Sequence, residues 1–195
     1  MARRGIFVWY RLVIIGALAL MAGTTFMFLR GPDFLQRLYY PLPEEYRSMI
    51  ADSAQRHRVS PYLVAAIIQG ESRWRSDAVS PAGAVGLMQL LPSTAADMDH
   101  AVAAHFASSA GKLTDPATNI EFGSAYFRFL VERYNEIEPA LAAYNAGMRN
   151  ADEWVAKGGD IRDAIEFPET RHYVLRVMRA KNAYERLYPD AFENE

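Results

Sequence analysis

The most apolar part of the sequence is an 18-residue run near its N-terminus that contains no charged side chain. It covers residues 12–29 (LVIIGALALMAGTTFMFL) and would span roughly 27 Å as a helix, at about 1.5 Å per residue. That length is close to the thickness of the hydrocarbon core of a membrane. Trp9 and Tyr10 precede the run, where interfacial aromatic residues are common. The pattern predicts a single transmembrane helix, with residues 1–30 as an N-terminal membrane anchor.

Arginines flank this run unequally and indicate its orientation. Three of them precede it, so the positive-inside rule favours a cytoplasmic N-terminus and an exported C-terminal part. The alternative is a cleavable signal peptide, whose apolar core is usually shorter and ends in an A-x-A-like site. Ala17-Leu18-Ala19 has that pattern but lies in the middle of the run. We favour the anchor, and both alternatives place the rest of the chain outside the cytoplasm.

Beyond the run, the apolar positions follow helical spacing almost throughout, after a short connector over residues 31–43. Prolines and capping residues mark the helix starts. The expected helices cover residues 44–57, 61–72, a short stretch from 92, 116–134, 139–147, a short stretch at 152–157, and 169–187. No segment has a convincing strand alternation. The pattern predicts a mainly α domain over residues 44–190, built as a compact bundle around a cleft.

Composition and charge exclude several classes of function. The 195 residues include no cysteine, which excludes disulfides, cysteine-based metal sites, a cysteine nucleophile and a lipid-acceptor cysteine. Residues 1–30 carry four arginines and no acid, so the net charge of −2 leaves −6 on the remainder, which does not favour nucleic-acid binding. The four histidines do not combine with acids at metal-ligand spacing, so we expect neither a metal nor a cofactor.

Glu71 is the first candidate for chemistry, because it ends a strongly apolar helix. A carboxyl in that position is partly desolvated, which favours its neutral form and suits a proton donor near neutral pH. By itself such a residue is more often a solvated acid at a helix end.

Three further segments carry polar groups suited to a ligand. Gly83 and Gly86 flank a short apolar loop before Gln89, whose amide offers a donor and acceptors; a tight turn that leads into the core is equally compatible. Tyr144 and Asn145 lie near a helix end that Gly147 would cap, although a buried tyrosine is the commoner reason for such a pattern. The third segment, residues 168–174, is compatible with an ordinary helix start.

Together these segments resemble the catalytic domain of the soluble lytic transglycosylases, a branch of the goose-type lysozyme-like fold. The matching parts are E-S at Glu71, S-P-x-G-x-x-G-L-M-Q from Ser80 to Gln89, A-Y-N-A-G from Ala143 to Gly147, and E-T-R-x-Y-V from Glu169 to Val174. Leu113-x-Asp115-Pro116-x-x-Asn119-Ile120-x-x-Gly123 also resembles the family's helix-opening segment. One departure is Glu166, which stands where the family often has proline.

The resemblance implies a reaction and a set of residues. Glu71 would protonate the leaving oxygen of the MurNAc–GlcNAc β-1,4 bond in peptidoglycan and then take a proton from the C6 hydroxyl, leaving 1,6-anhydroMurNAc ends. Tyr144 would orient Glu71 or the substrate's N-acetyl group. The residues that would line the cleft are Ser80, Met88, Gln89, Tyr144, Asn145 and Tyr173.

Two other functions remain open at this point. A lysozyme-type hydrolase on the same fold would need a second carboxylate near Glu71; Asp77 is the only acid between Glu71 and Asp97, although Glu166 or Glu169 could approach in the fold. An inactive glycan-binding scaffold would not need the acid. The resemblance implies peptidoglycan strands as the partner, with cell-wall or secretion-machinery proteins also possible. With the N-terminal apolar run and its flanking arginines, we expect a single-pass inner-membrane protein with a periplasmic catalytic domain, or a periplasmic protein after signal cleavage.

Overall fold

The computed structural model describes residues 2–30, 33–103 and 112–192. The chain divides into two compact units, residues 1–41 and residues 42–195. The first contains α1 (Ala2–Arg30) and α2 (Asp33–Tyr39). The second contains only helices and loops among the residues described.

In the first unit, α1 includes the apolar run of the sequence. Its large apolar side chains are exposed to the surroundings along the described part of the helix, from Trp9 at 67% to Met27 at 57%. Within the described residues, no helix meets the combined requirement of length and apolarity for crossing a membrane. Phe28 and Leu29, at the end of the predicted span, have side chains outside the described set.

The predicted connector differs in one respect, because α2 forms inside it. Asp33 lies in the first turn of α2 and Arg37 in the last, which is the arrangement that the helix dipole favours. The prediction for residues 31–43 was a short connector without a helix.

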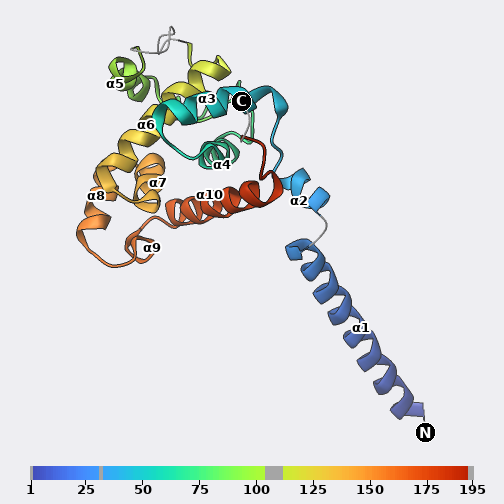
Figure 1. Cartoon of the computed structure of the whole chain (residues 1–195). Helices are drawn as coiled ribbons and strands as arrows, with labels where there is room; N and C mark the ends of the chain where they lie inside the picture. Colours follow the sequence, from blue (N-terminus) through green and yellow to red (C-terminus); the bar gives the residue numbers. More distant parts are fainter. Residues whose placement is uncertain (1, 31–32, 104–111, 193–195) are drawn as a thin grey trace. The chain divides into compact units, whose positions relative to one another are not determined.

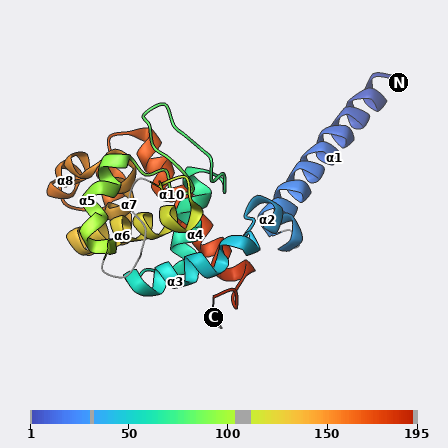
Figure 2. The same cartoon turned by 90° about the horizontal axis from the view of Figure 1, so that it is seen from above.

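The second unit is a bundle of short helices. In chain order they are η1 (Glu44–Tyr46), α3 (Arg47–His57), α4 (Pro61–Glu71), α5 (Pro92–Ala103), α6 (Pro116–Tyr134), α7 (Ile137–Ala146), α8 (Met148–Ala156), α9 (Ile161–Ala164) and α10 (Pro168–Leu187). Figures 1 and 2 show α4 packed between α3 and α10, while α6 contacts α3, α5 and α7. Residues 63–68 of α4 are all buried, so this apolar helix forms the centre of the core.

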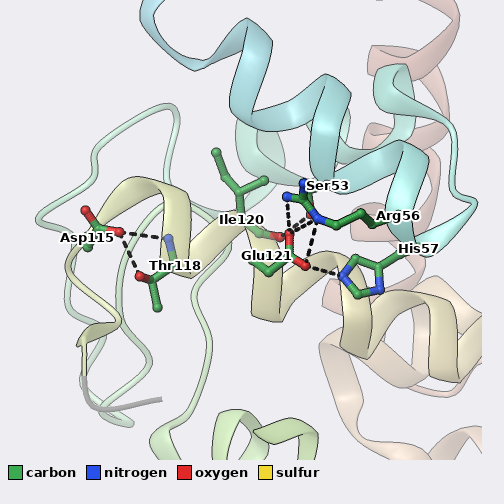
Figure 3. A network of polar contacts seen from close by, with 7 residues as sticks. All are labelled: Ser53, Arg56, His57, Asp115, Thr118, Ile120 and Glu121. Atoms are coloured by element: carbon green, nitrogen blue, oxygen red, sulfur yellow. Dashed lines mark hydrogen bonds and ion pairs between the residues drawn. The ribbon is translucent and has the colours of Figure 1, made fainter. Parts of the chain in front are cut away.

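Most of the predicted helices are confirmed, and their ends show why. Asp115 caps α6, because its carboxylate accepts hydrogen bonds from the Thr118 amide at 2.9 Å and the Thr118 hydroxyl at 2.7 Å (Figure 3). Gly147 has φ 85° and ends α7, as predicted, but α8 begins at the next residue rather than near residue 152. The four-residue α9 was not predicted, since so short a helix leaves no apolar periodicity.

A charged residue inside the core joins α3 to α6. The Glu121 side chain is fully buried and accepts hydrogen bonds from Arg56 at 2.7 Å and from His57 at 2.8 Å (Figure 3). Burial alone would raise the pKa of Glu121, but the hydrogen bonds from His57 and Arg56 outweigh it and lower the pKa to about 2. His57 is therefore part of the contact that joins α3 to α6.

Between α4 and α5, residues 72–91 form a long loop whose pairing is limited to two isolated bridges. Val85 pairs with Val79 on one side and with Leu90 on the other. The loop contains Ser80, Met88 and Gln89, and the contacts that fix it determine where these residues lie.

Candidate active site

Glu71 is the last residue of α4, at the point where the buried helix reaches the surface. Burial raises the pKa of Glu71 to about 7, and the Tyr173 hydroxyl and the Arg176 charge counteract part of that rise. The sequence had indicated such a partly desolvated carboxyl at this position. At neutral pH this group is therefore divided between its neutral and charged forms, and it can both give and accept a proton.

Glycine before the acid allows α10 to approach α4 closely. A Cβ atom at Gly70 would lie 3.1 Å from Val177 Cγ2 and 3.6 Å from Tyr173 Cε2. The close approach places the fully buried Tyr173 against Glu71. The Tyr173 hydroxyl is near enough to affect the Glu71 carboxyl, yet it has no partner with full hydrogen-bond geometry among the described residues.

Tyr144 approaches the same carboxyl from the last turn of α7. Burial and the nearby Glu71 together raise the pKa of Tyr144 well above its usual value, so the phenol stays neutral. Its hydroxyl donates a hydrogen bond to the Met88 carbonyl oxygen at 2.8 Å. The structure thus uses the Tyr144 proton to hold the loop, which the sequence analysis did not foresee.

Ser80 and Gln89 hold the loop in shape. The Ser80 hydroxyl accepts a hydrogen bond from the Ala84 amide at 3.0 Å. The Gln89 amide nitrogen donates to the carbonyl oxygens of Ala78 at 3.1 Å and Gly86 at 2.9 Å. The side chains of Ser80 and Gln89 remain partly exposed. The Gln89 amide donor, which was expected to bind a ligand, forms its hydrogen bonds within the loop.

Met88 differs from the other candidates because its side chain is fully buried. It packs on α6, where a Cβ atom at Gly123 would lie 2.3 Å from the Met88 sulfur. The Met88 amide donates to the side-chain oxygen of Asn119 at 2.7 Å. In this structure, the Met88 side chain therefore packs the loop onto α6.

Asn119 is a residue whose importance the sequence analysis did not see beyond its place in a motif. It is fully buried, and its amide nitrogen donates to the carbonyl oxygens of Val85 and Leu113, each at 2.9 Å. The bond to Val85 and the bond from Met88 attach the loop to α6, and the bond to Leu113 holds the segment before the helix. The sequence did contain one sign of this role, because an asparagine stands next to Ile120 among the apolar residues of a predicted helix.

Asn145, the remaining candidate, is exposed in the last turn of α7 beside Tyr144. The structure therefore brings Tyr144 and Tyr173 to the Glu71 carboxyl, while Ser80 and Gln89 lie in the adjoining loop that Tyr144 holds. Asp77, Glu166 and Glu169, the acids that the sequence left as possible partners of Glu71, are exposed. Among the described groups that shift the pKa of Glu71, none is a carboxylate.

Comparison with known proteins agrees with this arrangement. Residues 48–166 match the Transglycosylase SLT domain family. The soluble lytic murein transglycosylase of Escherichia coli K12 is 38% identical over 63% of this chain and 20% of that protein. The membrane-bound lytic murein transglycosylase C of Serratia proteamaculans is 29% identical over 73% of this chain and 47% of that protein.

Solved structures give the same result. An inactive mutant of the lytic transglycosylase Slt from Pseudomonas aeruginosa, in which a glutamate is replaced by glutamine, has a TM-score of 0.67 and 31% identity over 74% of this chain and 24% of that chain. This chain thus spans about a quarter of that protein and a fifth of the E. coli relative. The mainly α, lysozyme-like fold predicted from the motifs is confirmed, and the chain belongs to the Transglycosylase SLT domain family.

Proposed function

We propose that this protein is a lytic transglycosylase that cleaves the MurNAc–GlcNAc β-1,4 bond of peptidoglycan without water, with Glu71 as its single general acid and base. The observation that carries the proposal is the Glu71 carboxyl itself, whose pKa burial raises to about 7 and which interacts with the neutral Tyr144 and Tyr173. Relatives over most of this chain are named lytic murein transglycosylases.

The proposed reaction has two proton transfers through one carboxyl. In the first, neutral Glu71 protonates the bridging oxygen while the bond from C1 to that oxygen breaks, and the bonding electrons leave with the oxygen. In the second, the C6 hydroxyl oxygen bonds to C1 and gives its proton to the Glu71 carboxylate. The enzyme returns to its starting state, the product carries a 1,6-anhydro ring, and no water is consumed.

The surroundings of Glu71 favour this route over hydrolysis. A conventional two-carboxylate glycosidase needs a second acid near the scissile bond. The acids that the sequence left as candidates are exposed, and no described carboxylate affects the pKa of Glu71. The mutant in which one glutamate was changed to glutamine in the Pseudomonas relative is described as inactive, which supports an essential glutamate in that protein.

The other residues have supporting parts in the proposal. Tyr173 would hydrogen-bond the Glu71 carboxyl, and Tyr144 would hold the loop through Met88 while it faces the substrate. Ser80, Gln89 and Asn145, which are partly or fully exposed, would contact the sugars.

We also propose that α1 attaches the protein to the inner membrane, with residues 42–195 in the periplasm where peptidoglycan lies. The support is the exposure of apolar side chains along α1, including Ile15 at 61% and Leu20 at 70%. Exposed apolar side chains of this kind are costly in water. A relative of this chain is named a membrane-bound transglycosylase. Cleavage of the segment as a signal peptide is the alternative.

Digestion of peptidoglycan sacculi by the full-length protein in detergent, followed by mass spectrometry of the released fragments, tests the function. We expect fragments lighter by one water than hydrolytic products. Full-mass fragments with reducing ends would identify a hydrolase instead. Binding to sacculi without any release would leave only the scaffold function.

A further inference from the structure

Arg176 lies on α10 one turn beyond the Thr170–Tyr173 segment and is exposed. Its guanidinium carbon is 5.6 Å from the centroid of the Tyr173 ring. One guanidinium nitrogen is 3.5 Å from the carbonyl oxygen of Gly70, the residue before Glu71. The Arg176 side chain thus lies over the ring of Tyr173, the tyrosine that acts on Glu71. It also extends toward the end of α4.

The charge of Arg176 is not neutralised by an ion pair with any carboxylate in the described part of the chain. Its electrostatic effect is instead on Glu71, where it favours the charged carboxylate. The other titratable groups that face Glu71 are Tyr173, which lies on α10 like Arg176, and Tyr144 on α7. Both remain neutral because burial raises their pKa values. Arg176 is therefore the cation that acts on Glu71 among the described residues.

We propose that Arg176 is a positioning residue for this reaction: it holds the Tyr173 ring against Glu71 and supplies the positive charge that the Glu71 carboxylate faces after giving up its proton. The inference rests on the proposed function, because only an acid that must also act as a base needs both forms to be accessible.

The physical reason is the partial burial of Glu71. Burial helps the first step, since it favours the neutral acid. It also raises the free energy of the carboxylate that the first step leaves behind, because that carboxylate is poorly hydrated until the second step returns a proton to it. A cation at short range offsets that cost without forming a direct ion pair, which would hold the group permanently charged. A guanidinium over an aromatic face is well suited, because the contact with the ring fixes its place.

Three variants of the full-length protein test this proposal. Arg176→Gln removes the charge, Arg176→Lys keeps it, and Arg179→Gln removes an equal charge one turn further along α10 from a residue that is exposed and does not affect Glu71. The measurement is kcat/KM on sacculi as a function of pH, whose high-pH limb reports the loss of the neutral acid in the free enzyme.

We expect the high-pH limb of Arg176→Gln to move upward by about half a pH unit to one unit, since the opposite charge is close but screened by water. Its kcat should fall about tenfold or less, because the carboxylate intermediate is less stable. Arg176→Lys should retain much of the wild-type limb, and Arg179→Gln should overlay it. High salt should move the wild-type limb in the same direction as the Arg176→Gln change.

A second measurement does not depend on turnover. The carboxyl carbon of Glu71 can be titrated by NMR in wild type, Arg176→Gln and Arg179→Gln, with Glu71→Gln identifying the signal. An upward shift in Arg176→Gln alone supports the proposal. An unchanged titration, with activity lost only in step with thermal stability, would overturn it and leave Arg176 a packing residue. Wild-type protein that releases no anhydro products would instead overturn the proposed function, whatever the titration shows.

Discussion

The fold accommodates the neutral form of Glu71 better than its charged form. Its pKa rises from 4.5 to about 7 on folding because of burial. Between these two values the folded protein keeps a proton that the unfolded chain has released, so the free energy of unfolding decreases as the pH rises. A buried acid of this kind therefore weakens the structure near neutral pH.

Replacement of Glu71 by glutamine should remove this dependence. Relative to wild type, the free energy of unfolding of Glu71→Gln should increase by roughly 2–3 kcal/mol between pH 4 and pH 8, since one pKa unit is worth about 1.4 kcal/mol and the carboxyl is partly exposed. Urea denaturation of both proteins at a series of pH values measures the difference. If the free energies of unfolding of wild type and Glu71→Gln changed in parallel with pH, Glu71 would be solvated in the folded protein.

Individual residues differ in how far the sequence revealed them. Glu71 could be predicted only together with the other motifs, because a carboxyl at the end of an apolar helix is by itself more often a solvated acid. The bonding partners of Gln89 and Tyr144 could not, since the acceptors are backbone carbonyls of a loop whose path has no local pattern. Arg176 was overlooked because an arginine on the outer face of an amphipathic helix resembles an ordinary solvated residue.

At the scale of elements, the loop over residues 72–91 depends on its attachment to α6. Gly83 and Gly86 have almost the same positive φ, 83° and 82°. A Cβ atom at Gly83 meets nothing within 4 Å, whereas one at Gly86 would lie 2.7 Å from the Leu113 carbonyl oxygen and 2.3 Å from the Asn119 amide nitrogen. A substitution at Gly83 therefore tests backbone strain alone, whereas the same substitution at Gly86 tests backbone strain together with a steric clash.

Alanine at the two positions should have unequal effects. Gly83→Ala should cost about 1 kcal/mol of unfolding free energy, from the left-handed backbone alone. Gly86→Ala should cost at least about 3 kcal/mol, because it adds a steric clash and displaces the buried Asn119. It should also abolish cleavage of sacculi, since the loop would leave Tyr144. Thermal or urea denaturation with activity assays decides this, and equal losses in both variants would contradict the attachment.

The contact between α3 and α6 depends on Glu121 and is sensitive to acid. Because the pKa of Glu121 is lowered to about 2, its contribution to stability is present above its unfolded value of 4.5 and is lost as the pH falls toward 2. Glu121→Gln should cost roughly 3 kcal/mol at pH 7 and should flatten the stability curve between pH 4.5 and pH 2.

Glu132 on the same helix is the matched control, because it pairs with Arg128 at the surface. Glu132→Gln should cost less than about 0.5 kcal/mol at either pH. Equal costs for the two substitutions, measured by urea denaturation, would mean that the buried network adds no more than an exposed ion pair.

Element boundaries were predictable where local chemistry sets them. Asp115 before Pro116 and the glycine after α7 are signals that act within a few residues. The buried Glu121 gave no such signal, because its partners are 64 and 65 residues away in the chain. The short helices α2 and α9 escaped prediction because neither has enough turns to establish a period.

At the scale of the whole molecule, the question is how the two units are used together. If α1 anchors the protein, full-length protein with a C-terminal tag should remain in the membrane after a carbonate wash, with the tag digestible by protease from the periplasmic side. An N-terminal tag should stay on the same molecule. Release of the tagged N-terminus from a soluble periplasmic domain would show that the segment is a cleaved signal peptide.

In the proposed function, the single carboxyl of Glu71 cleaves the glycan without water. The most direct test of this function is digestion of sacculi by the full-length wild type and Glu71→Gln in ¹⁸O-labelled water, with mass spectrometry of the fragments. We predict wild-type fragments with anhydro ends and no label, and none from Glu71→Gln while its fold is retained. Labelled reducing ends, or cleavage by the variant at the wild-type rate, would rule out a water-free reaction by Glu71 alone.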